Sequence, residues 1–494
     1  MSTQLVWLKR DIRLQDHRPL AEASQRGPCI ILYVYEPEVI CSAEFDASHL
    51  DFINQSLKEL NQALQKYGAQ ITFRYGDIPD VFEALWQKTH FENIWSHQET
   101  GNYVSYQRDL RVADWAKSRG IDWKEFPQNG VIRRLGTRDG WSSRWYRRMK
   151  KPLTETPESI RPVEIPHEAP YEANELGVSP NRKIIQQGGE SHAHEMLASF
   201  LNRRGVNYTK AMSSPVTAWN ECSRLSAYLT YGNISIKQVY QAAQQQNENI
   251  KANHHSFDKR WKGSLSSFMG RLRWHCHFMQ KLEDQPSIEF ENMNSAYNGL
   301  REDVFDQDLF DAWCAGQTGY PLVDACMRCL HQTGWINFRM RAMLISFASY
   351  HLWLHWRPTA VYLAQHFLDF EPGIHFSQIQ MQSGTTGINA IRIYSPIKQV
   401  KDHDHEGWFI RQYVPELEFV PNQYIAEPHK MPVDLQFKTG CKIGIDYPAP
   451  IVDHKTAYHE ARERIYRAKG SAAARSKAKA VYQKHGSRRP GIAR

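Results

Sequence analysis

Short apolar runs alternate with segments of helical spacing over the first 130 residues, and this alternation constrains the fold more than any other feature of the chain. Residues 29–35 (CIILYVY) are apolar throughout, which is typical of a strand buried on both faces of a parallel sheet. Further strands are predicted at residues 5–8, 71–75, 93–96 and 121–126, and helices at residues 50–64, 81–89 and 103–118. This alternation predicts a doubly wound parallel sheet. No GxGxxG motif follows the first strand, so the fingerprint of a dinucleotide-binding sheet is absent.

The length of 494 residues fits two or three domains. From residue 131 to 195 the alternation stops and six prolines interrupt a polar stretch, which predicts a long interdomain linker packed on both domains. Residues 196–465 show helical spacing of apolar side chains, and residues 466–494 form a basic tail. The predicted fold class is therefore α/β + all-α, with an N-terminal doubly wound parallel sheet domain (residues 1–130), the linker, a C-terminal helical domain and the tail.

Composition excludes several classes of protein. No apolar run approaches the ~20 residues that a membrane-spanning helix needs. The first residues (MSTQLVWLKRDIRL) lack the cleavage site of a signal peptide, so we expect a cytoplasmic protein. Of eight scattered cysteines only Cys326 and Cys329 lie close together, as CxxC within a predicted helix. A zinc or iron–sulfur site normally needs a second pair, so we expect reduced thiols and no metal site.

The net charge of +8 is unevenly placed along the chain. Of the 61 Lys and Arg residues, nine lie in residues 467–494, which leaves 52 against all 53 acidic residues in the rest of the chain. The tail is either an arm for a polyanion or a solvated, partly helical end. A nucleic-acid-binding face on the body therefore has to come from local clustering of basic side chains.

Residues 251–281 show such a cluster, with seven Lys and Arg against one acidic residue. Five aromatic residues interleave with them: Phe257, Trp261, Phe268, Trp274 and Phe278. Basic side chains hold phosphates and aromatic rings give stacking surfaces for exposed bases, so the segment indicates a nucleic-acid contact. An amphipathic helix with a solvated basic edge would produce the same pattern, and both interpretations stay open.

Two further segments place polar side chains beside apolar helices. Ser223 and Ser226 are predicted in the first turn of a helix that ends before Gly232, where free N–H groups form either an anion site or a simple N-cap. Residues 322–330 and 340–351 predict two apolar helices. Charged and imidazole side chains are set into this part of the chain: Arg339, Arg341, Asp369, His375 and Arg392. Charges beside a core are costly unless they are paired or face a ligand, so either buried ion pairs or a binding site is expected there.

Several segments resemble, in the same order, the photolyase/cryptochrome family of flavoproteins. The matching segments are residues 5–23 (LVWLKRDIRLQDHRPLAEA), 223–235 (SRLSAYLTYGNIS), 318–343 (TGYPLVDACMRCLHQTGWINFRMRAM), 402–417 (DHDHEGWFIRQYVPEL) and 447–454 (YPAPIVDH). The resemblance extends over nearly the whole chain. It implies an N-terminal α/β domain, a long linker and a helical domain that binds FAD in a folded, U-shaped conformation.

The resemblance also assigns FAD-binding residues. Positions that contact the cofactor in the family are occupied here by Tyr208, Cys222, Ser223, Leu225, Ser226, Phe268, Arg271 and His275, of which the first five lie at the FAD phosphates and adenosine. Cys222 replaces the usual Thr and removes one hydroxyl group. Arg341 and Asp369 match an Arg–Asp pair beside the isoalloxazine ring, where the Arg would stabilise an anionic reduced flavin. Glu371 matches an acidic position near the ribityl chain, and His375 the position opposite flavin N5.

The family's lesion-binding residues are matched in part. Trp274 falls on the Trp that stacks on the dimer, and Arg339 on an Arg that contacts phosphate or lesion. Two usual contacts are lost, because Arg271 stands where the family has Glu and Met381 where it has a second aromatic residue.

The tryptophan chain that the family uses for photoreduction is interrupted. Trp356 matches its middle member, whereas Ile379 and Asp303 stand at the two flanking positions. Other tryptophans could offer another electron route: Trp313, Trp335, Trp353 and Trp408.

The implied activity is light-driven repair of UV-damaged DNA. In this family excited FADH⁻ transfers an electron to a pyrimidine dimer, the linking bonds split and the electron returns, with no nucleophile or metal required. We expect a deoxyribodipyrimidine photolyase that acts as a monomer, with cyclobutane dimers favoured over (6-4) products. The two-His arrangement of (6-4) enzymes is missing at Asn337 and Phe338, although His275, His277 and His375 could place a proton-donating imidazole in the pocket.

Two other functions stay open. A cryptochrome-type blue-light photoreceptor without repair activity would suit the interrupted tryptophan chain and the altered lesion contacts. A flavin-binding nucleic-acid module with neither activity is the other alternative. The N-terminal domain could also hold a second, antenna chromophore (a folate, a deazaflavin, a flavin or a lumazine), and the sequence does not select among these or show that one is bound.

Overall fold

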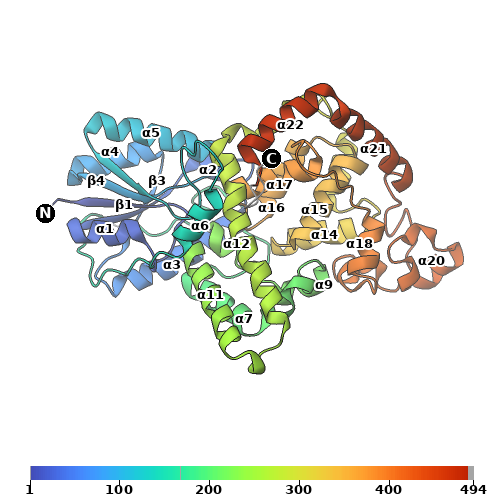
Figure 1. Ribbon diagram of the computed structural model, residues 1–494, viewed down its shortest axis with the longest axis horizontal. Coiled ribbons are helices and arrows are strands. Elements are labelled where there is room, and N and C mark those ends of the chain that lie inside the picture. The colour runs from blue at the N-terminus through green and yellow to red at the C-terminus, as the bar shows by residue number, and fades with distance from the viewer. Residues whose placement is uncertain (1, 167, 488–494) are drawn as a thin grey trace.

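A five-stranded parallel sheet forms the centre of the N-terminal domain in the computed structural model, which describes residues 2–166 and 168–487 (Figure 1). The strands are β1 (Gln4–Leu8), β2 (Cys29–Tyr35), β3 (Ile71–Tyr75), β4 (Asn93–His97) and β5 (Asp122–Phe126). Their order in the sheet is β3-β2-β1-β4-β5. In register, Leu5 of β1 pairs with Ile30 of β2 on one side and with Ile94 of β4 on the other. The predicted doubly wound parallel sheet is confirmed, and its winding reverses at β1.

Helices cover both faces of this sheet. They are α1 (Arg18–Arg26), α2 (Pro37–Ile40), α3 (Ala47–Gln65), α4 (Ile78–Thr89) and α5 (Tyr103–Arg119). Helices α1 and α3 share a hydrophobic core with Ile31 of β2, whereas α4 and α5 share another with Ile30 and Leu32. Residues 29–35 are therefore apolar without alternation because both faces of β2 are buried.

The segment between the domains contains a helix that the sequence pattern did not predict, α6 (Trp141–Met149). Its buried side chains recur at every fourth position and pack into a core of the helical domain: Trp141, Trp145 and Met149. Backbone hydrogen bonds tie the rest of the segment to both domains. Cys29 of β2 donates to the Arg161 carbonyl, and Ile184 donates to the carbonyl of Gln332.

The helical domain follows, on the right of Figure 1. Its first helices are α7 (Glu190–Asn202), α8 (Tyr208–Ala211), α9 (Pro215–Glu221), α10 (Ser226–Thr230), α11 (Ile236–Ala252), α12 (Arg260–Asp284), α13 (Gln307–Ala315) and α14 (Pro321–Thr333). The next are α15 (Phe338–Ser346), α16 (Trp356–His366), α17 (Pro372–Ser383), α18 (Pro396–His403), α19 (Trp408–Tyr413), α20 (Val433–Thr439), α21 (His454–Gly470) and α22 (Ala472–His485).

The two predicted apolar helices are present in this domain, with one difference in their geometry. Residues 322–330 lie in α14, and residues 340–351 lie in α15 and in a π-helical turn (Phe347–His351) that continues it. The prediction for Ser223 was wrong, because Ser223 lies in the loop before α10 and only Ser226 is in the helix.

Helix α22 packs most of the basic tail against the body. Val481 lies in the main core of the helical domain, and His485 is buried with its Nε2 2.8 Å from Gln285 Oε1. The Lys and Arg residues of α22 stay exposed. The tail thus contains a docked helix that ends at His485, and residues 488–494 lie outside the described residues.

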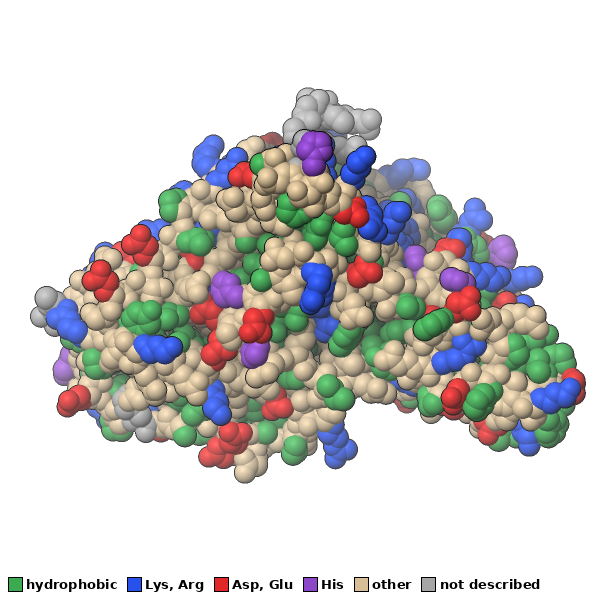
Figure 2. Space-filling model, turned by 90° about the horizontal axis from the view of Figure 1, so that it is seen from below, with side chains coloured by type: hydrophobic (Ala, Val, Ile, Leu, Met, Phe, Trp, Pro, Cys, Tyr) green, Lys and Arg blue, Asp and Glu red, His purple; other side chains and the backbone are tan. Residues whose placement is uncertain are grey.

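Figure 2 shows basic and acidic side chains interspersed over one face of the molecule. Hydrophobic side chains gather at the end that carries α20, where Val433, Phe437 and Ile445 are all more exposed than buried. In the described part of the chain, no helix combines the length and apolar character needed to cross a bilayer.

The two domains meet where the loop after β1 contacts the turn after α10. The Ile12 amide donates to the Tyr231 carbonyl (3.1 Å), and Arg13 Nη1 donates to the Gly232 carbonyl (3.0 Å). Gly232 has a φ of +72°, and a Cβ there would lie 2.2 Å from the Arg10 carbonyl oxygen, so only glycine fits. The carboxyl end of β1, where ligands bind in doubly wound sheets, therefore faces the segment around α10.

Candidate functional site

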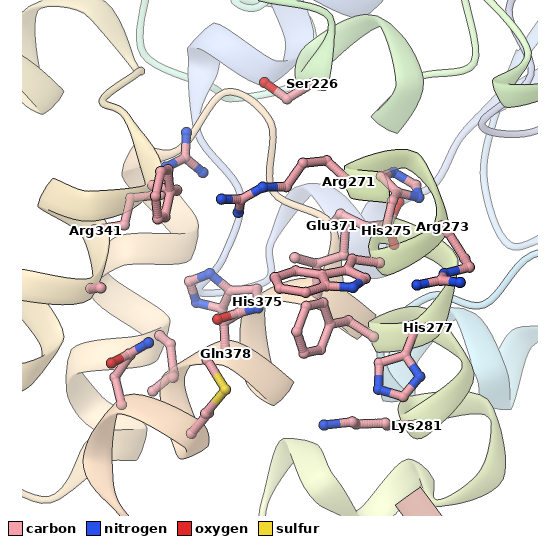
Figure 3. Close-up of a pocket in the computed structure, with 18 of the residues that line it drawn as sticks. Ser226, Arg271, Arg273, His275, His277, Lys281, Arg341, Glu371, His375 and Gln378 are labelled. Atoms are coloured by element: carbon pink, nitrogen blue, oxygen red, sulfur yellow. The ribbon is translucent and has the colours of Figure 1, made fainter. Parts of the chain in front are cut away.

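A cavity of about 1020 Å³ opens in the helical domain between α12, α15, α17 and residues 222–226. Figure 3 shows side chains of these elements converging on it. The predicted site residues that line it are Tyr208, Cys222, Ser223, Leu225, Ser226, Arg271, Trp274, His275, Arg339, Arg341, Asp369, Glu371, His375 and Met381. The fold thus brings together residues that are spread over most of the helical domain, in a space large enough for a cofactor.

Two predicted site residues do not line the cavity. Phe268 packs in the core of the helical domain, with its ring 4.7 Å from that of Phe200 and 6.0 Å from that of Tyr208. Trp356 is fully buried, and its Nε1 donates to Asn292 Oδ1 (2.7 Å). Phe268 is therefore not placed to contact a cavity ligand directly, and Trp356, predicted as the middle member of the electron-transfer chain, lies away from the cavity wall. Phe268 instead supports Tyr208, which does line the cavity.

The ion pair of Arg341 with Asp369 forms one wall of the cavity. Arg341 Nη1 and Nη2 each donate to one carboxylate oxygen of Asp369 at 2.9 Å, which is a bidentate arrangement. Arg341 Nε donates to the Ile336 carbonyl, and the guanidinium lies 4.0 Å from the centroid of the Phe367 ring. Burial pushes the pKa of Asp369 upward, but the charge and hydrogen bonds of Arg341 outweigh it and hold this pKa below its usual value. The cavity therefore has a guanidinium that is fixed before any ligand binds.

Several buried polar atoms on the cavity wall have no partner within the described part of the chain. They are Arg224 Nε, His275 Nδ1, Asn337 Oδ1 and Arg339 Nε. An unpaired buried polar group costs about 1–3 kcal/mol, so these atoms indicate that a ligand completes the site. Because they come from three separate segments of the wall, Arg224, His275 and residues 337–339, the ligand must carry polar groups at several points. FAD, with its ring, ribityl chain, phosphates and adenosine, fits this requirement.

Contacts of Arg224 with two tryptophan rings support residues 222–226, and the sequence analysis did not predict these contacts. The Arg224 guanidinium lies against both Trp219 and Trp335, 3.6 and 4.0 Å from their ring centroids, and the two rings meet each other edge to face. Arg224 also has a φ of +59°, a strained value that persists only where the surroundings hold it and that is frequent at ligand sites. Trp335 is distant in the sequence from Arg224 and Trp219, so this contact could not be predicted from spacing. Arg224 itself lies inside the segment, residues 223–235, that carried the family resemblance.

The mouth of the cavity combines exposed aromatic rings with basic side chains. Trp274 is 49% exposed and Phe338 is 39% exposed. The Arg271 guanidinium lies between them, 5.2 Å from the Trp274 ring centroid and 4.4 Å from that of Phe338. Arg273 and Arg339 add further positive charge to the lining. Such a surface can hold phosphates and stack an exposed base.

Four imidazoles line the cavity, including that of His485 at the end of α22, and all of them are neutral near pH 7. Burial lowers the pKa of His275 and of His375 to about 4. Burial, reinforced by neighbouring basic side chains, lowers the pKa of His277 to about 2. His375 Nε2 lies 2.8 Å from the Ala360 carbonyl oxygen, which can only accept, so Nε2 carries the ring proton. Nδ1 of His375 is consequently a hydrogen-bond acceptor.

Among the described residues, the side chains that could together ligate a metal are Asp11, His17 and His97 in the N-terminal domain. His97 Nδ1 and His17 Nε2 lie 2.7 and 3.0 Å from the same Asp11 oxygen. The Leu20 amide donates to His17 Nδ1, so His17 carries its proton on Nε2, toward Asp11. A ring nitrogen that carries a proton cannot ligate a metal, and this cluster is a buried hydrogen-bonding group.

Two family models match the chain. The model of the DNA photolyase family matches residues 4–165, and the model of the FAD-binding domain of DNA photolyase matches residues 268–467. The first range covers the sheet domain, and the second covers α15, α17 and most of α12, which carry much of the cavity wall.

Similar proteins include both photolyases and cryptochromes. A deoxyribodipyrimidine photo-lyase of Alkalihalophilus pseudofirmus is 27% identical over 485 residues, covering 92% of this chain and 95% of that protein. Cryptochrome-2 of Arabidopsis thaliana is 27% identical over 484 residues, covering 92% of this chain and 77% of that protein. The crystal structure of a class III photolyase from Agrobacterium tumefaciens shares the fold, with a TM-score of 0.82 and 24% identity over 95% of this chain and 98% of that one. With both family models matching in order, this chain belongs to the photolyase/cryptochrome family and carries that family's FAD-binding domain.

Proposed function

We propose that this chain is a blue-light-driven, FAD-dependent deoxyribodipyrimidine photolyase that splits UV-induced pyrimidine dimers in DNA. The observation that carries the proposal is the exposed Trp274 at the cavity mouth, beside the Arg271 guanidinium. A damaged base extruded from a duplex needs a stacking surface and contacts to its backbone phosphates, and this mouth offers both. Relatives that are named photo-lyases support the same activity.

Bound FAD would supply a reduced, light-excited electron donor. Arg341, fixed by Asp369, would stabilise an electron-rich ring, and the acceptor Nδ1 of His375 suits a ring N–H. Ser226 lies at one end of the cavity in Figure 3, and we assign the cofactor phosphates to this end, next to Arg224. A second, antenna chromophore stays a prediction.

The neutral imidazoles favour cyclobutane dimers over (6-4) products as the substrate. Repair of a (6-4) product needs a proton donor, whereas splitting a cyclobutane ring by electron transfer does not. His275 and His375 hold no extra proton near pH 7, and the ring proton of His375 is committed to the Ala360 carbonyl. We therefore assign neither His275 nor His375 the role of proton donor in repair of a (6-4) product.

A cryptochrome-type photoreceptor without repair activity is the alternative. It is favoured by the altered electron route, since Ile379 lines the cavity and Trp356 does not. Trp335 does line the cavity, but the Arg224 cation, 4.0 Å from its ring centroid, makes loss of an electron from the indole ring less favourable. Met381 at the cavity wall also offers less stacking surface than an aromatic ring.

A light-dependent repair assay tests the proposed activity. Protein with fully reduced FAD would be incubated with two oligonucleotides, one with a cyclobutane thymine dimer and one with a (6-4) product, in blue light and in the dark. We expect repair of the cyclobutane dimer in light only. Absence of repair of either lesion would favour the photoreceptor, and repair of the (6-4) product alone would reverse the lesion assignment.

Replacement of Trp274 by Ala tests the stacking surface. Stacking is worth about 1–3 kcal/mol for each base, so the variant should bind dimer-containing DNA about tenfold or more weakly, with a smaller loss on undamaged DNA. Fluorescence anisotropy with both duplexes measures the difference. Trp408→Ala is the matched control, because Trp408 is an exposed tryptophan that does not line the cavity. An equal loss on damaged and undamaged DNA would mean that Trp274 has no role at the lesion.

Glu371→Gln tests the electrostatics of the cavity. Burial raises the pKa of Glu371 to about 7, although Arg10 lies 3.9 Å away. The folded chain therefore holds this proton to a higher pH than the unfolded chain does, and the free energy of unfolding should fall as pH rises from about 4.5 to 7. The variant lacks this fall, so relative to wild type it should gain about 3 kcal/mol between about pH 5 and pH 8. Denaturant unfolding of flavin-free protein measures the gain, and parallel pH profiles would contradict the assigned pKa.

A further inference from the structure

The cavity has a second basic end, away from the residues assigned to FAD. Figure 3 shows Ser226 at one end of the cavity and Lys281 at the other, with His277 next to Lys281, and the charge of Arg273 also acts on His277. Arg138 and His485, the last residue of α22, line the same cavity and act electrostatically on His277. We call these five side chains, Arg138, Arg273, His277, Lys281 and His485, the Lys281 branch.

Lys281 is a buried ammonium group without a counter-charge. Its side chain extends from α12 into the cavity (Figure 3), and the residue is only 3% exposed. Within residues 2–166 and 168–487, Nζ forms no ion pair, and it lies 5.0 Å from the centroid of the Phe278 ring. Burial, together with the charge of Arg138, lowers the pKa of Lys281 to about 8. Burying an unpaired ammonium is costly, so its retention in a cavity points to an anionic ligand.

The neighbouring side chains do not supply the missing negative charge. Among the described acidic residues, Asp139 lines the cavity next to Arg138 in the chain, and Asp284 lies 3.6 Å from Arg138 Nη1 and has a pKa that is raised by burial. Arg138 Nη2 in turn lies 2.5 Å from His277 Nδ1. The imidazoles of His277 and His485 are neutral, because burial and the surrounding cations lower their pKa values to about 2 and about 3. Among the described residues, the cations Arg138, Arg273 and Lys281 thus outnumber the carboxylates Asp139 and Asp284, so the Lys281 branch keeps an excess of positive charge.

We propose that the Lys281 branch binds a phosphate group, and that this phosphate belongs to the backbone of the damaged DNA strand. A phosphate oxygen would accept from Lys281 Nζ and supply the missing charge. The FAD phosphates are assigned to the opposite end, so this phosphate belongs to a second ligand. Trp274 and Lys281 are seven residues apart on α12, which puts them on one face of the helix, roughly 10 Å from each other. A strand whose base stacks on Trp274 can therefore reach Lys281.

The assignment of this phosphate to DNA rests on the proposed function. The same basic side chains could also bind the phosphate group of a small molecule, so the tests have to separate the two ligands. The first test measures binding of flavin-loaded protein to a duplex with one cyclobutane dimer over a series of KCl concentrations. One lost phosphate contact should lower the slope of log K against log salt by about 0.9 in Lys281→Met. Met has nearly the length of Lys and removes an unpaired buried charge, so the variant should fold and keep its flavin spectrum. Lys438→Met on α20, whose side chain is 75% exposed, is the matched control and should bind as wild type does.

A second test separates this proposal from the proposed function. Inorganic phosphate is titrated calorimetrically into flavin-loaded protein, in which the Ser226 end is already filled. We expect saturable binding to wild type and to Lys438→Met, and loss of that binding in Lys281→Met. No such binding would overturn the phosphate site, whether or not the protein repairs DNA. Phosphate binding that depends on Lys281, combined with an unchanged salt slope on DNA, would overturn the DNA assignment and identify a small-molecule phosphate as the ligand.

Discussion

The bidentate ion pair of Arg341 with Asp369 is the interaction on which the cavity depends. It connects α15 to the loop before α17, and the remaining Arg341 contacts, with the Ile336 carbonyl and the Phe367 ring, leave the guanidinium little freedom. Buried ion pairs often add little stability, because desolvation offsets their attraction. A pair that holds a cation at the wall of a cavity has another effect. The free-energy cost of removing the Arg341 guanidinium from water is incurred when the protein folds. The cation is therefore already oriented when a ligand binds.

The charges around the cavity divide it into parts with different chemistry. At the ring position assigned to the flavin, Arg341 is paired while His375 presents an acceptor nitrogen. At the mouth, Arg271 lies between two exposed rings, and at the far end Lys281 is buried and unpaired. Neutral imidazoles lie between these cations. The arrangement suits a cofactor that stays in place and a polyanion that enters past Trp274, which is the order of binding that the proposed light-driven repair would require.

Much of the fold followed from local patterns, whereas parts of the site depend on contacts that sequence spacing cannot show. Residues 29–35 predicted a strand buried on both faces because an unbroken apolar run of this length is typical of a central parallel strand, and β2 is such a strand. Helix α6 was missed because its buried side chains are outnumbered by basic and polar ones.

Phe268 was predicted at the cofactor because its position in the family matched, but its ring packs into the core beneath Tyr208. Arg224 stands out only once its contacts with Trp219 and Trp335 are seen in space. Lys281 stands out only because it is buried in the cavity and forms no ion pair with a described residue.

The affinity of flavin-free protein for FAD, compared between wild type and Asp369→Asn, tests the central claim most directly. Hydrogen bonds to charged groups are worth about 1.5–3 kcal/mol, and the variant loses the carboxylate that holds Arg341 at the cavity wall. Quenching of flavin fluorescence gives both dissociation constants, and the helical signal in circular dichroism shows whether the variant has folded. The account predicts that folded Asp369→Asn binds FAD about tenfold or more weakly than wild type. Equal affinity in a folded variant would contradict it, because the flavin site would then not depend on the Arg341–Asp369 pair.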